Sequence, residues 1–253
     1  RPVSKLHHTY YPALKQQFIT FENHETRERK KVVSDFRHIV GAIVTLFNPL
    51  SATSLSQLLD IAQNVIEHRI EMLHSVLNVP KGSDSPIRLL HLSFRDYLVD
   101  QGQREVNEFW INEGDVHHIL FRSCLRLMRR HLRNDICDIQ QPGASRFEIP
   151  SELIKKHVPP ELEYACLYWI PHLIAKGAAP DTEDVYSFLA VHLLHWIEVL
   201  GLLHKCNECV PLLMKLQDWW QVSQRHCYST RTAIYIIPHR QQMEVFGKSH
   251  LEI

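Results

Sequence analysis

A cysteine pair in the last quarter of the chain has the spacing of a metal or redox site. Cys206 and Cys209 are separated by two residues, and His204 stands just before them. This spacing suits tetrahedral zinc, which thiolate and imidazole ligands bind. The remaining ligands would have to be His226 and Cys227, which are adjacent and therefore poorly placed for one ion, and no βαβ pattern surrounds the pair as a redox motif requires. We interpret these cysteines as packing or surface thiols, with a zinc enzyme or redox protein as an alternative.

A Gly-Lys-Ser triplet at residues 247–249 has the last three letters of a phosphate-binding loop. Such a loop needs another glycine five positions earlier and a helix directly after it. Gln242 stands at the earlier position, and only four residues follow Ser249. The helix N-terminus that would bind phosphate has no room to form. No other catalytic arrangement emerges, so we expect no enzyme activity and no metal or cofactor bound by this chain alone.

Five arginines share one face of a helix that Asp115 can cap. The opposite face of this helix is apolar, as expected for a helix that lies on a core. The arginine face is either solvated or a surface for an acidic partner, including another domain of a longer protein. The arginines are Arg122, Arg126, Arg129, Arg130 and Arg133.

The composition is that of a globular protein without a strong overall electrostatic field. The 253 residues are 45% apolar, and the formal net charge is zero. These values favour a folded core and give no global attraction to nucleic acid or to anionic lipid. We see no signal peptide and no uninterrupted apolar run long enough to span a bilayer. Reduced thiols in the cytoplasm are the expectation for the six cysteines.

Residues 34–100 have the element order of a winged-helix domain. Apolar residues recur at three- and four-residue spacing in three successive segments, which predicts three helices. Pro49 ends the first helix, Ser54 can cap the second, and Asn64 can cap the third with Glu67 as the return half of a capping box. Two short apolar pieces separated by a polar turn then predict a two-strand wing, and another helix follows.

Residues 101–227 predict an α-helical array that connects this domain to whatever follows. Pro160 suits the first turn of a helix that Gly177 ends, and Asp181 or its neighbour can cap the longest helix. No tandem period of a repeat protein is present. The predicted fold class is therefore mainly α, with at most a short two-strand wing.

The two ends of the chain fit this plan less well. Residues 1–33 combine a short apolar patch with a charged run, which predicts a helical remnant or linker. Residues 228–253 include a β-type stretch at 232–237, and we expect an atypical tail outside the helical core, with disorder as one outcome.

Several sequence words resemble fungal NACHT proteins, the signal-transduction NTPases that control vegetative (heterokaryon) incompatibility. The resemblance runs from about residue 34 to about residue 220. The sequence segments that carry the resemblance are HIVGAIVTLFNPLSATSLSQLLDI, LHSVLNVP, DSPIRLLHLSFRDYLVD, FRSCLRLMRRHLRNDICDIQ, PPELEYACLYWIPHL and HLLHWIEVLGLL.

The resemblance implies a regulatory region rather than a catalytic one. The resembled segment follows the nucleotide-binding core in that family, so the implied partners are a NACHT domain upstream, which would hold ADP or ATP, and a C-terminal repeat domain such as a WD-repeat propeller. Self-association is a further implied partner, whereas nucleic acid and membrane are not.

His91 is the site residue that the resemblance selects. In related nucleotide switches an apolar-apolar-His-x-Ser/Thr-Phe motif places a winged-helix histidine on the phosphates of ADP, and residues 89–94 read Leu-Leu-His-Leu-Ser-Phe. We expect a partly exposed ring, with Leu89, Leu90 and Phe94 buried around it. The alternative is a histidine that is hydrogen-bonded at a strand end.

A winged-helix DNA-binding regulator is the alternative function. Residues 64–77 would supply the helix that reads DNA, but their charged residues are Glu67, Arg69 and Glu71. DNA affinity comes largely from lysine and arginine on phosphates, so this composition favours a protein contact.

Overall fold

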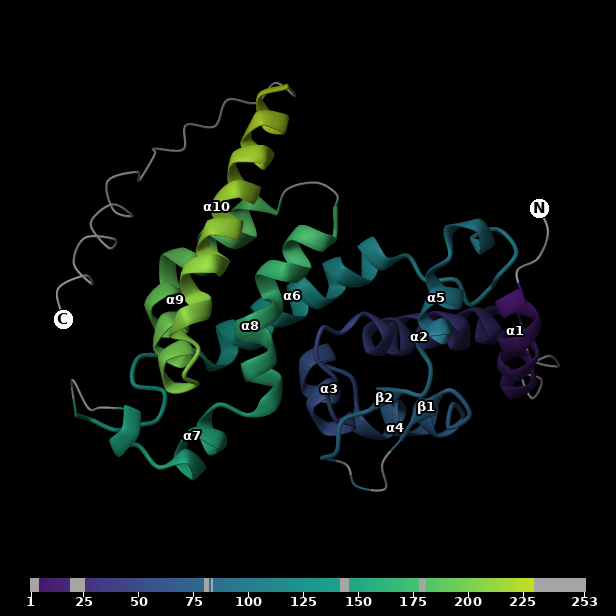
Figure 1. Ribbon diagram of the computed structural model, residues 1–253, viewed down its shortest axis with the longest axis horizontal. Helices are drawn as coiled ribbons and strands as arrows, with labels where there is room; N and C mark the ends of the chain where they lie inside the picture. The colour runs from purple at the N-terminus through teal and green to yellow at the C-terminus, as the bar shows by residue number, and fades with distance from the viewer. Residues whose placement is uncertain are drawn as a thin grey trace.

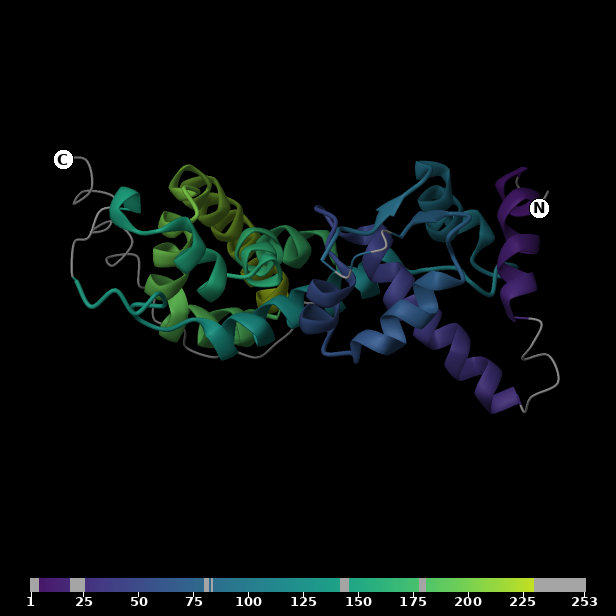
Figure 2. The same cartoon turned by 90° about the horizontal axis from the view of Figure 1, so that it is seen from below.

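The computed structural model describes residues 5–18, 26–79, 82, 84–141, 146–177 and 181–229. Within these ranges the chain forms ten α-helices and one antiparallel sheet of two short strands. The predicted mainly α fold class is therefore confirmed. We call residues 5–112 the N-terminal unit and residues 113–229 the helical array. The two lie side by side along the long axis in Figure 1, and Figure 2 shows α1 at the end farthest from α9 and α10.

The predicted element order of residues 34–100 is present in the structure. Three helices precede the two strands, and a further helix follows, although the first helix begins at Thr26, before the expected boundary. The bounds are α2 Thr26–Thr45, α3 Ala52–Leu59, α4 Gln63–Glu71, β1 Leu77–Asn78, β2 Arg88–Leu89 and α5 Leu92–Val99. The assignment of this unit to the winged-helix class stays a prediction.

The sheet is small, and the loop before α3 extends it. Leu77 pairs with Leu89 in antiparallel register. Ser51 forms an isolated bridge with Pro86, and the N–H of Ile87 donates to the carbonyl of Leu50 at 2.9 Å. These bonds fix the position of the chain that enters α5. Part of the predicted turn between the strands lies outside the described residues.

Three predicted helix caps are wrong. Ser51, not Ser54, caps α3, because its hydroxyl accepts the backbone N–H of Ser54 at 3.1 Å. Helix α4 begins at Gln63 after Ala62 and has no side-chain cap, so the predicted capping box does not form. Asn112 caps the arginine-bearing helix.

The N-terminal helix α1 (Lys5–Phe18) packs on α5, which shows that the apolar patch in residues 1–33 contacts the unit that follows it. The ring of Tyr10 lies 5.3 Å from that of Phe94 and 5.6 Å from that of Tyr97. Burial of aromatic rings at such distances stabilises a helix pair.

The helical array has one core, centred on its aromatic residues. Trp169, Phe188 and Trp196 are fully buried and pack edge to face. The Trp196 indole N–H donates to the carbonyl of Cys166 at 2.8 Å, which satisfies the buried donor. The α-helices of the array are α6 Glu113–His131, α7 Ser151–His157, α8 Pro160–Ala175, α9 Thr182–Leu202 and α10 Cys206–Ser229.

Two features of the array bear on the sequence predictions. The pair α6 and α8 makes the most extensive helix contact of the described chain. Pro160 begins α8 as predicted, and Gly177 follows its end with φ +69°, a conformation that glycine adopts without strain. The tail at residues 230–253 lies outside the described residues.

Helix α9 corrects the expectation that no segment is long and apolar enough to cross a membrane. By length and composition alone, α9 passes that test among the described helices. The sequence prediction counted uninterrupted apolar residues, whereas mean hydropathy tolerates the two histidines within this helix. Core helices of globular proteins also pass, and α9 packs against α8 and α10, so this is weak support for a membrane span.

Candidate functional site

His91 lies between the sheet and α5, where it is the N-cap of that helix. Its Nδ1 accepts the backbone N–H of Ser93 at 3.2 Å and lies 2.6 Å from the Ser93 hydroxyl oxygen. The hydroxyl of Tyr10 on α1 lies 2.7 Å from the same oxygen. Because Nδ1 accepts the Ser93 N–H, the neutral ring carries its proton on Nε2. His91 is an exposed residue.

The residues around His91 are only partly as predicted. Phe94 is fully buried, but Leu90 is 55% exposed and the following Leu92 is 71% exposed. Strand side chains alternate, and only one face of this small sheet is covered. Ile87 and Leu89 turn toward the core, so Leu90 must turn away from it. The prediction that Leu90 is buried was therefore wrong, and His91 stands between two exposed leucines.

The arginine face of α6 has partners on both parts of the molecule. Arg122 and Arg129 form ion pairs with Asp184 in the first turn of α9. On the other side, Arg126 donates to the carbonyl of Leu58 at the end of α3, at 2.7 Å. Asp60, the C-cap of α3, is the carboxylate partner on this side. The face therefore contacts acidic groups of this chain and is more than a solvated surface.

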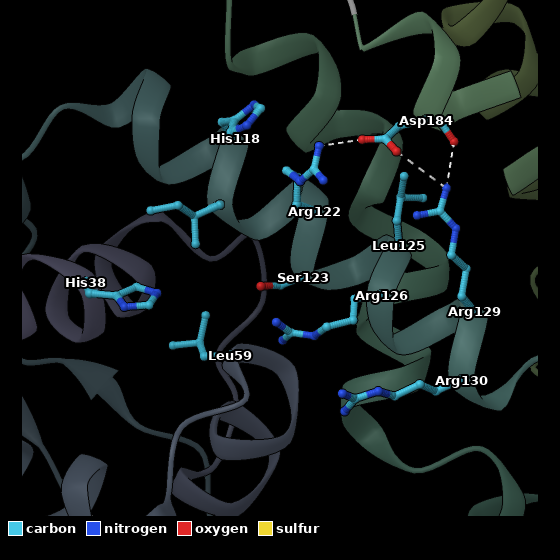
Figure 3. A pocket seen from close by; sticks show the side chains of 11 residues that line it. His38, Leu59, His118, Arg122, Ser123, Leu125, Arg126, Arg129, Arg130 and Asp184 are labelled. Atoms are coloured by element: carbon cyan, nitrogen blue, oxygen red, sulfur yellow. Dashed lines mark hydrogen bonds and ion pairs between the residues drawn. The ribbon is translucent and has the colours of Figure 1, made fainter. Parts of the chain in front are cut away.

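Four of these arginines line a cleft with a volume of about 630 Å³ between the N-terminal unit and the array. Figure 3 shows Arg122 and Arg129 reaching toward Asp184, whereas Arg126 and Arg130 point to the opposite side, where Leu59 lies. His38 on α2 faces the cleft from the N-terminal unit. Burial is the main cause that lowers the pKa of His38. The charged groups that line the cleft are therefore four guanidinium groups and the carboxylate of Asp184.

A buried polar chain joins the same two parts at another place. The backbone N–H of Phe47 donates to the Tyr164 hydroxyl oxygen at 3.2 Å, and that hydroxyl lies 2.7 Å from Nε2 of His172. Nδ1 of His172 lies 2.7 Å from Nδ1 of His117. The helices concerned, α6 and α8, pack against each other and cross in Figure 1. We call these four residues the histidine chain.

Burial keeps both imidazoles of the histidine chain neutral. His172 is fully buried and His117 is 8% exposed. Burial, with a smaller effect of His117, lowers the pKa of His172 to about 3. Burial also lowers the pKa of His117, an effect that Glu113 opposes and Arg95 strengthens. The sequence analysis missed this group because its members are far apart along the chain and no local motif marks them.

The other sequence candidates do not form a site. Cys206 is exposed and Cys209 half-buried on α10, and the described residues contain no group of three potential metal ligands. The side chains of His226 and Cys227 lie outside the described residues, as does the triplet at 247–249. On α4, the one arginine, Arg69, is 7% exposed and so does not face a DNA backbone.

Comparison with known proteins places the chain near one fungal protein. It is 24% identical to vegetative incompatibility protein HET-E-1 of Podospora anserina. The match covers 72% of this chain but only 15% of the length of HET-E-1. No family model and no solved structure matches the chain. The similarity supports a relation to fungal incompatibility proteins at the level of a segment, and it gives no role to any residue.

Proposed function

We propose that the chain is a non-catalytic regulatory region of a NACHT-type signalling protein of the vegetative incompatibility kind. In this proposal the N-terminal unit closes on a nucleotide-binding domain, and His91 donates a hydrogen bond to a phosphate of bound ADP. The helical array connects the unit to a C-terminal repeat domain. The similarity to HET-E-1 supports the protein class. The exposed position of His91 at the start of α5 supports its role as the phosphate contact.

The orientation of the His91 ring is the observation that carries this proposal. Ser93 occupies Nδ1 at the start of α5 and the residue is exposed, so we infer that the Nε2 N–H is available to an acceptor outside the unit. An N–H donor held in one direction suits an anionic acceptor, and a hydrogen bond to a charged group contributes about 1.5–3 kcal/mol. The exposed Leu90 and Leu92 beside it provide apolar surface that another domain can cover.

A substitution in the full-length parent protein tests the role of His91. His91→Ala removes the donor, so the closed, ADP-bound state should lose about tenfold or more of its population relative to the open state. The expected result is faster ADP release and constitutive signalling. His74→Ala is the matched control, since His74 is also exposed and its Nδ1 contacts a local carbonyl, that of Glu71. ADP release that is equal in the wild type and in His91→Ala would contradict the proposal.

The non-catalytic role has a test of its own. The purified 253-residue chain should not hydrolyse ATP or GTP, because the sequence supplies no phosphate-binding loop. The measurement is phosphate release, compared with a mock purification from the same host. Turnover above the mock level that scales with the amount of this chain would contradict the proposal.

A further inference from the structure

The arginine cleft has more positive than negative charge on its walls. Four arginines line it, and Asp184 is the acidic residue among the lining residues. Asp60 stands at its edge and contacts two of these arginines, so four guanidinium groups share two carboxylates. Arginine binds phosphate and carboxylate through several donors in one plane, so guanidinium donors remain for a further anion.

The arginines are arranged as two pairs along α6, and each pair meets one carboxylate. Arg122 and Arg129 meet Asp184, with the Arg129 contact at 3.7 Å. Arg126 and Arg130 meet Asp60 at 4.0 and 3.4 Å. The Asp60 contacts are long and the carboxylate is half exposed, so a stronger anion can displace it. The cleft therefore offers two anion positions, one toward Asp184 and one on the opposite side, toward Asp60.

His38 adds a second, independent observation. Its Nε2 is enclosed and has no hydrogen-bond partner among the described residues. Buried nitrogen atoms are normally paired, because an unpaired one costs free energy. In Figure 3 the ring points across the cleft toward the α6 arginines. The residue as a whole is only partly buried, so a rotation of the ring that brings Nε2 to the cleft surface would let an oxygen of a ligand become this missing partner.

The size of the cleft favours a small molecule over a protein helix. Pockets for small ligands usually measure about 300–1,000 Å³. An α-helix about 10 Å wide would fill the available volume in about five residues. The buried side chains of Leu59 and Leu125 contribute apolar wall, which also admits an organic group beside the anion.

We propose that this cleft binds a small molecule with two or more phosphate groups, which displaces Asp60 and Asp184 from the arginine pairs. Phosphate carries more charge than the carboxylate it replaces, and its oxygens match the planar guanidinium. Since α3 belongs to the N-terminal unit and α9 to the array, the ligand would bind between the two parts. The proposal does not depend on the role of His91, which is not among the residues that line the cleft.

Calorimetric titration of the full 253-residue chain with inorganic tripolyphosphate, at low ionic strength, tests this site. Arg126→Gln should weaken binding by about tenfold or more, because a charged hydrogen-bond donor is lost. Asp60→Asn should strengthen it by about two- to fivefold, because a competing carboxylate is removed. An increase in affinity cannot come from unfolding, and asparagine tolerates the left-handed backbone of residue 60, which has φ +60°.

Arg133→Gln is the matched control. Arg133 lies two residues past the end of α6, not on its arginine-bearing face as the sequence predicted, and its side chain is 55% exposed. It pairs with Asp138 at 2.7 Å and does not line the cleft. Its substitution should leave the affinity unchanged. A parallel titration with ADP distinguishes an organic phosphate ligand, which would bind more tightly than its diphosphate group alone, from a purely inorganic one.

Three results would overturn the proposal. The first is no binding of tripolyphosphate or ADP by the wild-type chain. The second is an equal loss of affinity in Arg126→Gln and Arg133→Gln, which would indicate attraction to the whole arginine face. The third is tighter binding of an acidic peptide than of tripolyphosphate, which would assign the cleft to a protein segment.

Discussion

The histidine chain and the arginine cleft both connect the N-terminal unit to the helical array, but they differ in burial. The imidazole of His172 is fully enclosed, whereas the side chains of Arg122 and Arg130 are 54% and 57% exposed. A buried polar group that loses its partner costs free energy because water cannot replace the partner. An exposed ion pair is replaced by water at little cost.

This difference in burial gives the two contacts different roles: one stabilises the fold, and the other can respond to a ligand. The histidine chain should fix how Phe47 of the N-terminal unit sits against α6 and α8. The arginine cleft contributes little to folding, so its ion pairs can exchange for a ligand without unfolding the protein. The predictions below test this division, from the largest expected effect to the smallest.

Removal of the central imidazole should have the largest effect. His172→Ala leaves a cavity and removes the partner of both Tyr164 and His117, so the free energy of unfolding should fall by about 3 kcal/mol or more. Urea denaturation measures this change. His118→Ala is the control, because His118 is half exposed on α6 and contacts Asp181 at 3.4 Å; it should cost less than about 1 kcal/mol. Equal losses in the two variants would remove the distinction between buried and exposed contacts.

Acid should weaken the histidine chain. The pKa of His172 is about 3 in the folded protein and 6.5 in its ordinary state. Between these values the unfolded chain binds a proton that the folded chain does not, so stability falls as the pH falls. The loss should approach about 1.4 kcal/mol per pH unit for this group.

A variant without the titrating ring isolates this contribution from that of the other histidines. His172→Phe should give a shallower dependence of unfolding free energy on pH between about 6.5 and 4.5. The measurement is urea denaturation of both proteins across this range. Parallel curves for the two proteins would show that His172 does not carry the effect.

Loss of a single hydroxyl should have an intermediate effect. Tyr164→Phe removes the acceptor of the Phe47 N–H and the partner of His172 Nε2, at about 1–3 kcal/mol. Tyr186→Phe is the matched control, since Tyr186 is 50% exposed on α9. A stability change no larger than that of the control would mean that water replaces the lost bonds.

The smallest effect should come from the arginine cleft. Asp60→Asn removes the carboxylate that Arg126 and Arg130 share, yet the unfolding free energy should change by less than about 1 kcal/mol. The comparison is made at low and at high salt, and the difference between wild type and variant should shrink as salt screens the pairs. A loss of several kcal/mol that persists in high salt would place the cleft in the structural core.

Local sequence patterns were sufficient to predict most of the helices and the apolar faces that they turn toward the core. The spacing of apolar residues predicted the three helices before the two-strand sheet. These features follow from the period of a helix, which the chain carries residue by residue. The caps were less predictable, because several polar residues near a helix start compete for the same backbone N–H groups, and the structure uses Ser51 and Asn112.

The sequence by itself determined the mainly α fold class, the short two-strand sheet and the position of His91 between strand and helix. Only the tertiary structure decided that Asp60 and Asp184 face the α6 arginines, that His117 meets His172, and that Leu90 turns outward. These outcomes depend on which helices pack together and which face of the sheet is covered. Contacts between residues far apart in the chain are set by that packing, and no periodicity or short motif encodes them.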